Sequence, residues 1–161
     1  MIKQIGEMLV SDYMTANVIS VDDSAKLTAA IRCMDDEGLQ VLPVLDEQGN
    51  VVGMLSTADL IQITHEIQAD LSALNHVNES TKQFLIQMLV DAGDTTYVRD
   101  VMTSPVETIK PCDNLVIAAK ILSGRHYRHL PVIDEEGKPV GILSTSDFVR
   151  VVAELGGLIA G

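Results

Sequence analysis

The chain contains an internal repeat that extends over most of its length. Residues 10–60 and 98–148 align without a gap at a constant offset of 88, and 19 of the 51 aligned positions are identical. An internal repeat constrains the fold strongly, because each copy is one structural unit that buries its apolar face against its neighbour. We therefore expect two copies of one small unit, packed as a pseudo-twofold pair.

The identical positions gather in three short motifs. These are Asp-x-Met-Thr, Leu-Pro-Val and Gly-x-Leu-Ser-Thr-x-Asp, which begin at residues 12, 42 and 53 in the first copy and at residues 100, 130 and 141 in the second. Since the motifs recur in the same order and at the same spacing, both copies are expected to share one fold.

Each copy has the pattern β-α-β-β-α, so the predicted fold class is α/β (more narrowly α+β). In the first copy the pattern predicts strands over 18–21, 41–45 and 51–55, a helix from Ser24 to about Gly38, and a second helix from Ser56 or Thr57. The second copy repeats it, with strands over 106–109, 130–133 and 140–143 and helices over about 115–122 and 145–155. Turn residues at 46–50 and 134–137 predict antiparallel hairpins, and residues 156–161 are expected to be frayed.

The segment between the copies is predicted to be a helical insertion. One apolar stripe runs through Ile67, Leu71 and Leu74 and a second covers 84–89, with breaks expected at 75–78 and 92–94. This periodicity is typical of packed helices rather than of a flexible linker. The predicted division is therefore residues 1–61 for the first repeat with a short N-terminal helix, 62–97 for the insertion and 98–161 for the second repeat.

The composition excludes several classes of protein. Apolar residues make up 47% of the chain and aromatic residues only 3%, so the core must be aliphatic. No apolar run approaches the ~20 residues of a membrane span, and a signal-peptide pattern is absent. Cys33 and Cys112 occupy non-equivalent places, which favours reduced thiols in a cytoplasmic protein over a disulfide. A net charge of −12 argues against nucleic acid or an anionic membrane as a partner, but it allows a small anion in a locally basic pocket.

The repeated motifs resemble those of the CBS domain family. The resemblance rests on Met-Thr before a strand, Leu-Pro-Val-x-Asp in the middle and Gly-x-Leu-Ser-x-x-Asp at the end, all present in both copies. A tandem pair of such domains is called a Bateman module. The resemblance implies a stand-alone regulatory protein. Members of the family bind adenine nucleotides, S-adenosylmethionine or other molecules, or in some cases no ligand.

Two interpretations apply to the Ser-x-x-Asp motifs at Ser56–Asp59 and Ser144–Asp147. The first is a capping box, in which the hydroxyl and the carboxylate satisfy free N–H groups at the start of a helix. The second follows from the resemblance, which implies that the aspartate holds the ribose hydroxyls of a nucleotide. The hydroxyls of Ser56, Thr57, Ser144 and Thr145 and the helix N–H groups would then face a phosphate. The two interpretations are compatible, because serine can cap while aspartate turns outward.

Residues 125–131 form the most basic stretch of this acidic chain, whereas the equivalent residues 37–43 carry no positive charge. The resemblance implies that Arg128 and His129 meet the phosphate of a nucleotide whose ribose is held by Asp59. The Asp147 site would then have only Gln40 and Val41, so we expect one good nucleotide site and one poor or empty one. Arginine suits phosphate through its fork of donors, and His129 would make phosphate affinity depend on pH. The alternative is a solvated basic edge paired with surface carboxylates.

The resemblance also assigns an apolar slot for adenine. Its candidates start two predicted strands or lie within two others, namely Val18, Ile19, Ser20, Val106, Glu107, Thr108, Met54 and Ile142. Taken alone, each of these residues is more typical of the core than of a binding site. Burial of the base between aliphatic side chains would contribute ~25 cal/mol per Å².

Signals for catalysis or for a metal are weak. His65-Glu66 begins like a zinc-protease motif but lacks the second histidine, and His126-x-x-His129 has no third ligand. Neither Cys33 nor Cys112 has a histidine or aspartate at a readable spacing. The sequence therefore predicts a protein that is not an enzyme, holds no metal and requires no cofactor.

The hypothesis from the sequence is a cytoplasmic regulatory module that binds an adenine nucleotide in the cleft between the repeats. AMP is the first candidate, ADP and ATP are further ones, and the output would pass to a separate effector protein. Surplus apolar residues at Val116, Ile117 and Ile121 predict a homodimer with a twofold interface. The alternatives are an interaction or assembly module with an empty pocket, a sensor of S-adenosylmethionine, for which Arg128 would matter less, and an enzyme.

Overall fold

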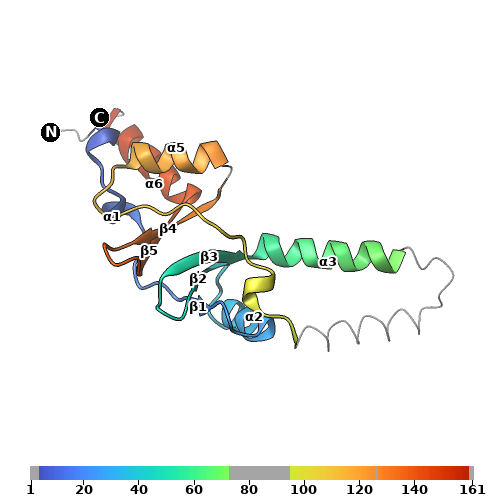
Figure 1. Cartoon of the computed structure of the whole chain (residues 1–161). Coiled ribbons are helices and arrows are strands. Elements are labelled where there is room, and N and C mark those ends of the chain that lie inside the picture. The colour runs from blue at the N-terminus through green and yellow to red at the C-terminus, as the bar shows by residue number, and fades with distance from the viewer. Residues whose placement is uncertain (1–3, 73–94, 126, 160–161) are drawn as a thin grey trace. The chain divides into compact units, whose positions relative to one another are not determined.

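The computed structural model describes residues 4–72, 95–125 and 127–159 (Figure 1). The chain forms two compact units, and neither is continuous in sequence. Unit 1 comprises Met1–Ile19, Gln48–Val51 and Val106–Gly161, and unit 2 comprises Ser20–Glu47 and Val52–Pro105. Each unit therefore combines most of one repeat with the segment that begins the other.

The described part of unit 2 contains a three-stranded sheet and the helices α2 and α3. In chain order its elements are β1 (Val21–Asp22), α2 (Leu27–Asp36), β2 (Val41–Leu45), β3 (Val51–Ser56, whose first residue belongs to unit 1), α3 (Thr57–Ser72) and the 3-10 turn η3 (Val98–Asp100). The strand order is β1-β2-β3, and β1 pairs with β2 in parallel. The core is aliphatic, as the composition predicts, and comprises Leu27, Ala30, Met34, Leu42, Val44, Leu55 and Val98.

The first helix of this unit starts later than the sequence predicts. The expected start was Ser24, but α2 begins at Leu27 because Lys26 is extended and bridges to Tyr97. The Leu27 N–H donates to the Thr96 carbonyl, and the Val98 N–H donates to the Ala25 carbonyl. This pairing with a distant segment uses the N–H and carbonyl groups that an earlier helix start would need.

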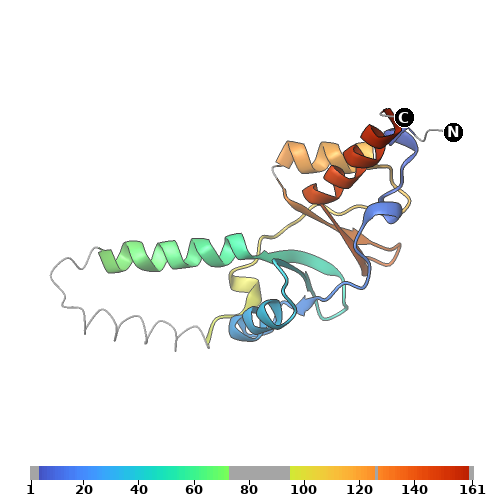
Figure 2. The same cartoon turned by 180° about the vertical axis from the view of Figure 1, so that it is seen from behind.

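Unit 1 packs two helices on a two-stranded antiparallel sheet. Its elements are η1 (Ile5–Glu7), α1 (Val10–Tyr13), α5 (Leu115–Arg125), β4 (His129–Ile133), β5 (Pro139–Ser144) and α6 (Thr145–Ile159). Leu130 pairs with Leu143 across the sheet, and this confirms the second predicted hairpin. Both helices lie on one side of the two strands, as Figures 1 and 2 show. The core includes Leu115, Ala118, Leu122, Leu130, Val132, Leu143 and Val151.

Two predicted strands are shorter than expected, and one helix is longer. The strand predicted over 18–21 is only Val21–Asp22, and that predicted over 106–109 is a single bridge from Ile109 to Val132. The remaining predicted positions do not pair as a ladder with a neighbouring strand, and a strand forms only where its backbone finds a partner. The expected fraying from residue 156 is wrong up to Ile159, since α6 continues to that residue, with Val151 and Leu155 packed on the core.

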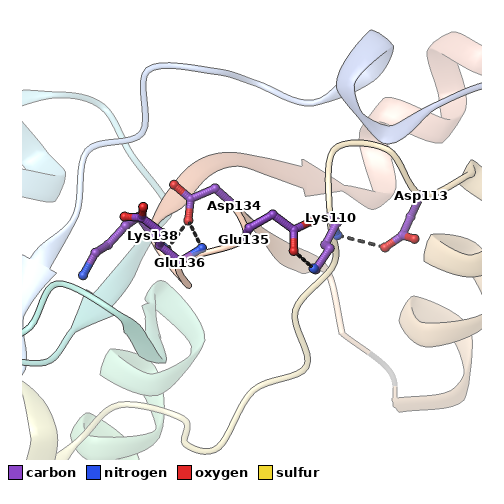
Figure 3. Close-up of polar contacts among 6 residues, drawn as sticks. All are labelled: Lys110, Asp113, Asp134, Glu135, Glu136 and Lys138. Carbon is purple, nitrogen blue, oxygen red and sulfur yellow. Dashed lines mark hydrogen bonds and ion pairs between the residues drawn. The ribbon is translucent and has the colours of Figure 1, made fainter.

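The turn between β4 and β5 is organised by one carboxylate. Asp134 Oδ1 accepts hydrogen bonds from the backbone N–H groups of Glu136 at 2.9 Å and Lys138 at 2.8 Å (Figure 3). Gly137 adopts a φ of +86°, which glycine tolerates without strain. Beside the turn, Lys110 forms an ion pair with Glu135. The Lys138 ammonium donates to Asn50 Oδ1 at 3.2 Å, so that the turn at 48–51 is held within unit 1.

The repeated Met-Thr and Gly motifs contact each other across the repeats. In unit 2, Thr103 and Met54 exchange two backbone hydrogen bonds of 2.9 and 3.0 Å, and a Cβ on Gly53 would lie 2.9 Å from the Thr103 carbonyl oxygen. In unit 1, Thr15 and Ile142 exchange two bonds of 2.9 Å in the same way. Each repeat therefore places its first motif against the last strand of the other, and this exchange explains why both units are discontinuous.

The sequence division at 61 and 62 falls inside α3, which is continuous from Thr57 to Ser72 and extends away from the sheet of unit 2 (Figure 1). The second apolar stripe at 84–89 and the breaks expected at 75–78 and 92–94 lie outside the described residues. Among the helices that the structure describes, none is long and apolar enough to cross a bilayer. The boundaries of the insertion stay a prediction.

Candidate functional site

The first Ser-x-x-Asp motif forms a capping box at the start of α3. Asp59 Oδ2 accepts hydrogen bonds from the backbone N–H of Ser56 at 2.7 Å and from the Ser56 hydroxyl at 2.6 Å. The Asp59 N–H in turn donates to Ser56 Oγ at 3.4 Å. The capping interpretation is thus confirmed, and it occupies only one of the two carboxylate oxygens.

The second oxygen of Asp59 binds a side chain from a different part of the chain. The Thr103 hydroxyl donates to Asp59 Oδ1 at 2.8 Å, and the neighbouring Ser104 hydroxyl donates to the Val52 carbonyl at 2.7 Å. Both threonine and aspartate belong to unit 2, where the exchanged Met-Thr motif meets β3. Asp59 Oδ1 is therefore placed to accept a hydrogen bond from a hydroxyl group at the surface of this unit.

The second motif repeats the cap but not the outer contact. Asp147 Oδ2 accepts bonds from the Ser144 N–H at 2.7 Å and from the Ser144 hydroxyl at 2.8 Å. Its Oδ1 lies 3.7 Å from Nη1 of Arg150, one turn further along α6. Asp147 is 8% exposed, so this carboxylate is held in a nearly buried position at the start of the helix.

Arg128 and His129 lie beside the start of α6 in unit 1. The Arg128 carbonyl accepts the N–H of Thr145 at 2.9 Å, and His129 pairs with Ser144 across the sheet. Burial lowers the pKa of His129 below its ordinary value, and the charge of Arg128 lowers it further, whereas Asp147 raises it. The predicted pairing of these two residues with Asp59 joins residues of different units and stays a prediction.

The candidates for the adenine slot are distributed over both units. Met54 is buried in unit 2 beside Thr103, and Ile142 is half-buried in unit 1 beside Thr15. Val18, Ile19, Val106, Glu107 and Thr108 belong to unit 1 and Ser20 to unit 2. Ile19 is 37% exposed, and Glu107 forms an ion pair with Arg125 at 3.4 Å. Their role in binding adenine stays a prediction.

The structure thus brings together two sets of predicted residues. Unit 2 gathers Met54, Ser56, Thr57 and Asp59, and unit 1 gathers Arg128, His129, Ile142, Ser144, Thr145 and Asp147. Thr103 and Arg150 were missed. Thr103 recurs as Thr15 in the first copy, and Arg150 is a charged residue where the first copy has Gln62. Comparison of the two repeats could therefore have identified both residues. Among the described residues, no three His, Cys, Asp or Glu side chains form a group that holds a metal.

Comparison with known proteins identifies the repeat. The CBS domain family matches residues 10–66 and 98–154. The chloroplastic CBS domain-containing protein CBSX2 of Arabidopsis thaliana is 30% identical over 156 residues, which are 93% of this chain and 66% of the relative. The uncharacterized protein MJ1426 of Methanocaldococcus jannaschii is 30% identical over 154 residues, which are 90% of this chain and 91% of that protein.

Solved structures show the same fold. A crystal structure of CBSX2 in complex with AMP matches with a TM-score of 0.68 and 27% identity, and it covers 92% of this chain and 98% of that one. The CBS domain pair of MJ0100, in complex with 5′-methylthioadenosine and S-adenosyl-L-methionine, matches with a TM-score of 0.66. Its identity is 20% over 91% of this chain and 97% of that one, so it shows the fold alone.

The two matched ranges coincide with the two copies of the internal repeat, and both carry a capped aspartate at the start of a helix. This chain belongs to the CBS domain family and contains its tandem pair.

Proposed function

We propose that this chain is a regulatory module that binds an adenine nucleotide, with AMP as the first candidate and ADP and ATP as further ones. The observation that carries the proposal is that the two oxygens of each aspartate have different partners. Oδ2 caps a helix, and Oδ1 lies against a side chain that a ligand could replace, the Thr103 hydroxyl at Asp59 or the Arg150 guanidinium at Asp147. The AMP complex of CBSX2, a relative that shares this fold, supports the choice of ligand.

The proposed chemistry is recognition without catalysis. A ribose hydroxyl takes the position on Oδ1 that Thr103 now holds, while Oδ2 stays in the cap and fixes the carboxylate. Arg128, His129, the hydroxyls of Thr57 and Thr145 and the positive ends of the helix dipoles bind the phosphate. The predicted aliphatic residues around Met54 and Ile142 cover the base.

Regulation requires that the ligand bind two states of the protein with different affinities. We propose that the output passes to a separate effector protein and that the module acts as a homodimer in the cytoplasm. In unit 1 the side chains of Ile117, Val149 and Val152 are 42%, 68% and 67% exposed and supply apolar surface for a partner. Ile121, which the sequence also assigns to the interface, is half-buried and packs against the core of unit 1.

A thermal-shift screen with AMP, ADP, ATP, adenosine and S-adenosylmethionine tests the proposal. A ligand at a hundred times its dissociation constant stabilises the fold by about 2.7 kcal/mol, which raises the midpoint by roughly 5–10 °C at this chain length. We expect AMP to give such a shift and the Asp59→Asn/Asp147→Asn double variant to lose it. Asp36→Asn, on an exposed side chain of α2, removes a charge elsewhere and should leave the shift unchanged. Absence of any shift would favour the assembly module.

A further inference from the structure

The two candidate aspartates differ in the group that holds their outer oxygen. Asp59 Oδ1 accepts a hydrogen bond of 2.8 Å from the neutral Thr103 hydroxyl. Asp147 Oδ1 instead faces the cationic Arg150, whose Nη1 lies 3.7 Å away. Both carboxylates accept the same two bonds through Oδ2, from the N–H and the hydroxyl of the capping serine, so their outer oxygens mark the main difference in partner.

The difference follows a substitution between the repeats. Three residues after the aspartate, the second copy has Arg150 and the first has Gln62. A second difference of the same kind lies beside the helix start. The Thr145 N–H donates to the backbone carbonyl of Arg128, whereas the equivalent Thr57 N–H donates to the backbone carbonyl of Gln40. In sequence, the start of α6 therefore has arginine at two nearby positions, and the start of α3 has glutamine at the two equivalent positions.

The exposure of the two partners shows which of them can move. The side chain of Arg150 is 60% exposed, whereas that of Asp147 is 11% exposed. The guanidinium can leave for solvent or for another acceptor, but the carboxylate is fixed by its two bonds from Ser144. An arriving ribose hydroxyl thus competes with Arg150 for a stationary oxygen.

The outcome of this competition depends on the charge of the ligand. An uncharged adenosine ligand separates Arg150 from its carboxylate and offers the guanidinium no new anion. A phosphate-bearing ligand offers one, and arginine binds phosphate through two parallel hydrogen bonds. At Asp59 the displaced group is only a hydroxyl, which water satisfies.

We propose that Arg150 is a specificity-determining residue. It makes the Asp147 site prefer adenosine ligands that carry a phosphate over uncharged ones, a preference that the Asp59 site lacks. This inference rests on the proposed function and adds to it the ligand class of each site.

Titration calorimetry with adenosine and AMP tests the inference in an Asp59→Asn background, which isolates the Asp147 site. Arg150→Gln copies the first repeat. It should tighten adenosine binding about two- to fivefold, the equivalent of an exposed ion pair, and weaken AMP binding about tenfold. In an Asp147→Asn background, Gln62→Arg should weaken adenosine binding by a similar two- to fivefold.

Opposite shifts for the two ligands support the inference, including a gain of adenosine binding where the background variant binds none. If the two affinities change in the same direction, or if both change by less than twofold, the inference is overturned. The proposed function still stands in that case, provided that the unsubstituted protein binds AMP. If the unsubstituted protein binds neither ligand, the proposed function and this inference both fail. Circular dichroism and the unfolding midpoint of each variant identify any loss of fold. Arg150→Lys keeps the charge but not the fork of donors, so its affinities for both ligands should fall between those of the arginine and glutamine forms.

Discussion

At Asp59 and Asp147, a single side chain caps the N-terminus of a helix and also presents its second oxygen to another group. The capping half of this arrangement contributes to stability whether or not a ligand binds. Asp59→Ala removes the two bonds from Ser56 and the bond from Thr103, and it should lower the free energy of unfolding by about 1–2 kcal/mol, of which a lost cap is typically the larger share. Urea unfolding measures this, and the exposed Asp36→Asn should stay within about 0.5 kcal/mol of the unsubstituted protein. An unchanged midpoint for Asp59→Ala would contradict the capping role.

His129 makes stability depend on pH. Its pKa in the folded protein lies below the ordinary value because of burial and Arg128, with Asp147 acting in the opposite direction. As the pH falls below about 6.5, the unfolded chain takes up a proton that the folded chain does not, so stability falls with pH. His129→Val copies Val41 of the first repeat and removes this contribution.

The measurement for His129 is the urea midpoint at pH 7.5 and at pH 5.5, in the unsubstituted protein and in His129→Val. We expect the variant to lose less stability over this interval. An equal or greater loss in the variant would show that the histidine titrates alike in both states. Phosphate binding should respond in the opposite sense, since protonation of His129 favours the anion.

At the scale of elements, the packing of the last strand of the first repeat, β3, requires a glycine. A Cβ on Gly53 would lie 2.7 Å from Met102 Sδ and 2.9 Å from the Thr103 carbonyl oxygen, and the backbone oxygen has no room to move while Thr103 pairs with Met54. Gly53→Ala should therefore destabilise the protein by roughly 1–3 kcal/mol, as overpacking does.

A matched control for Gly53→Ala is Gly124→Ala in α5, where nothing lies within 4 Å of the added Cβ. This variant should be neutral or gain about 0.5–1 kcal/mol, because alanine favours helix over glycine. Thermal or urea unfolding of the two variants compares them directly. Equal effects at the two positions would mean that the contact with Met102 and Thr103 does not constrain Gly53.

Local pattern predicted the elements well where the contacts are local. Apolar spacing located α5 and β4 within a few residues, and turn chemistry located the hairpin at Gly137. The late start of α2 was missed because it depends on Tyr97, far along the chain. The Thr103–Asp59 bond spans 44 positions and was missed for the same reason. Sequence alone shows which residues recur, but not that the recurring motifs are exchanged between the repeats.

At the scale of the whole molecule, the exchange links the two repeats within each unit. Met14 and Thr15 of the first repeat complete unit 1, and Met102 and Thr103 of the second complete unit 2. Thr103 also binds the outer oxygen of Asp59, so a ligand that displaces its hydroxyl alters a contact between segments of different repeats. A ligand with different affinities for the two arrangements shifts the population between them.

The most direct test of the account is a calorimetric titration of the intact protein with AMP, alongside the Asp59→Asn/Asp147→Asn double variant. The account predicts saturable binding to the unsubstituted protein and its loss in a double variant that remains folded by circular dichroism. Absence of binding at millimolar AMP, or undiminished binding in the double variant, would contradict the claim that these two aspartates make the chain a nucleotide sensor.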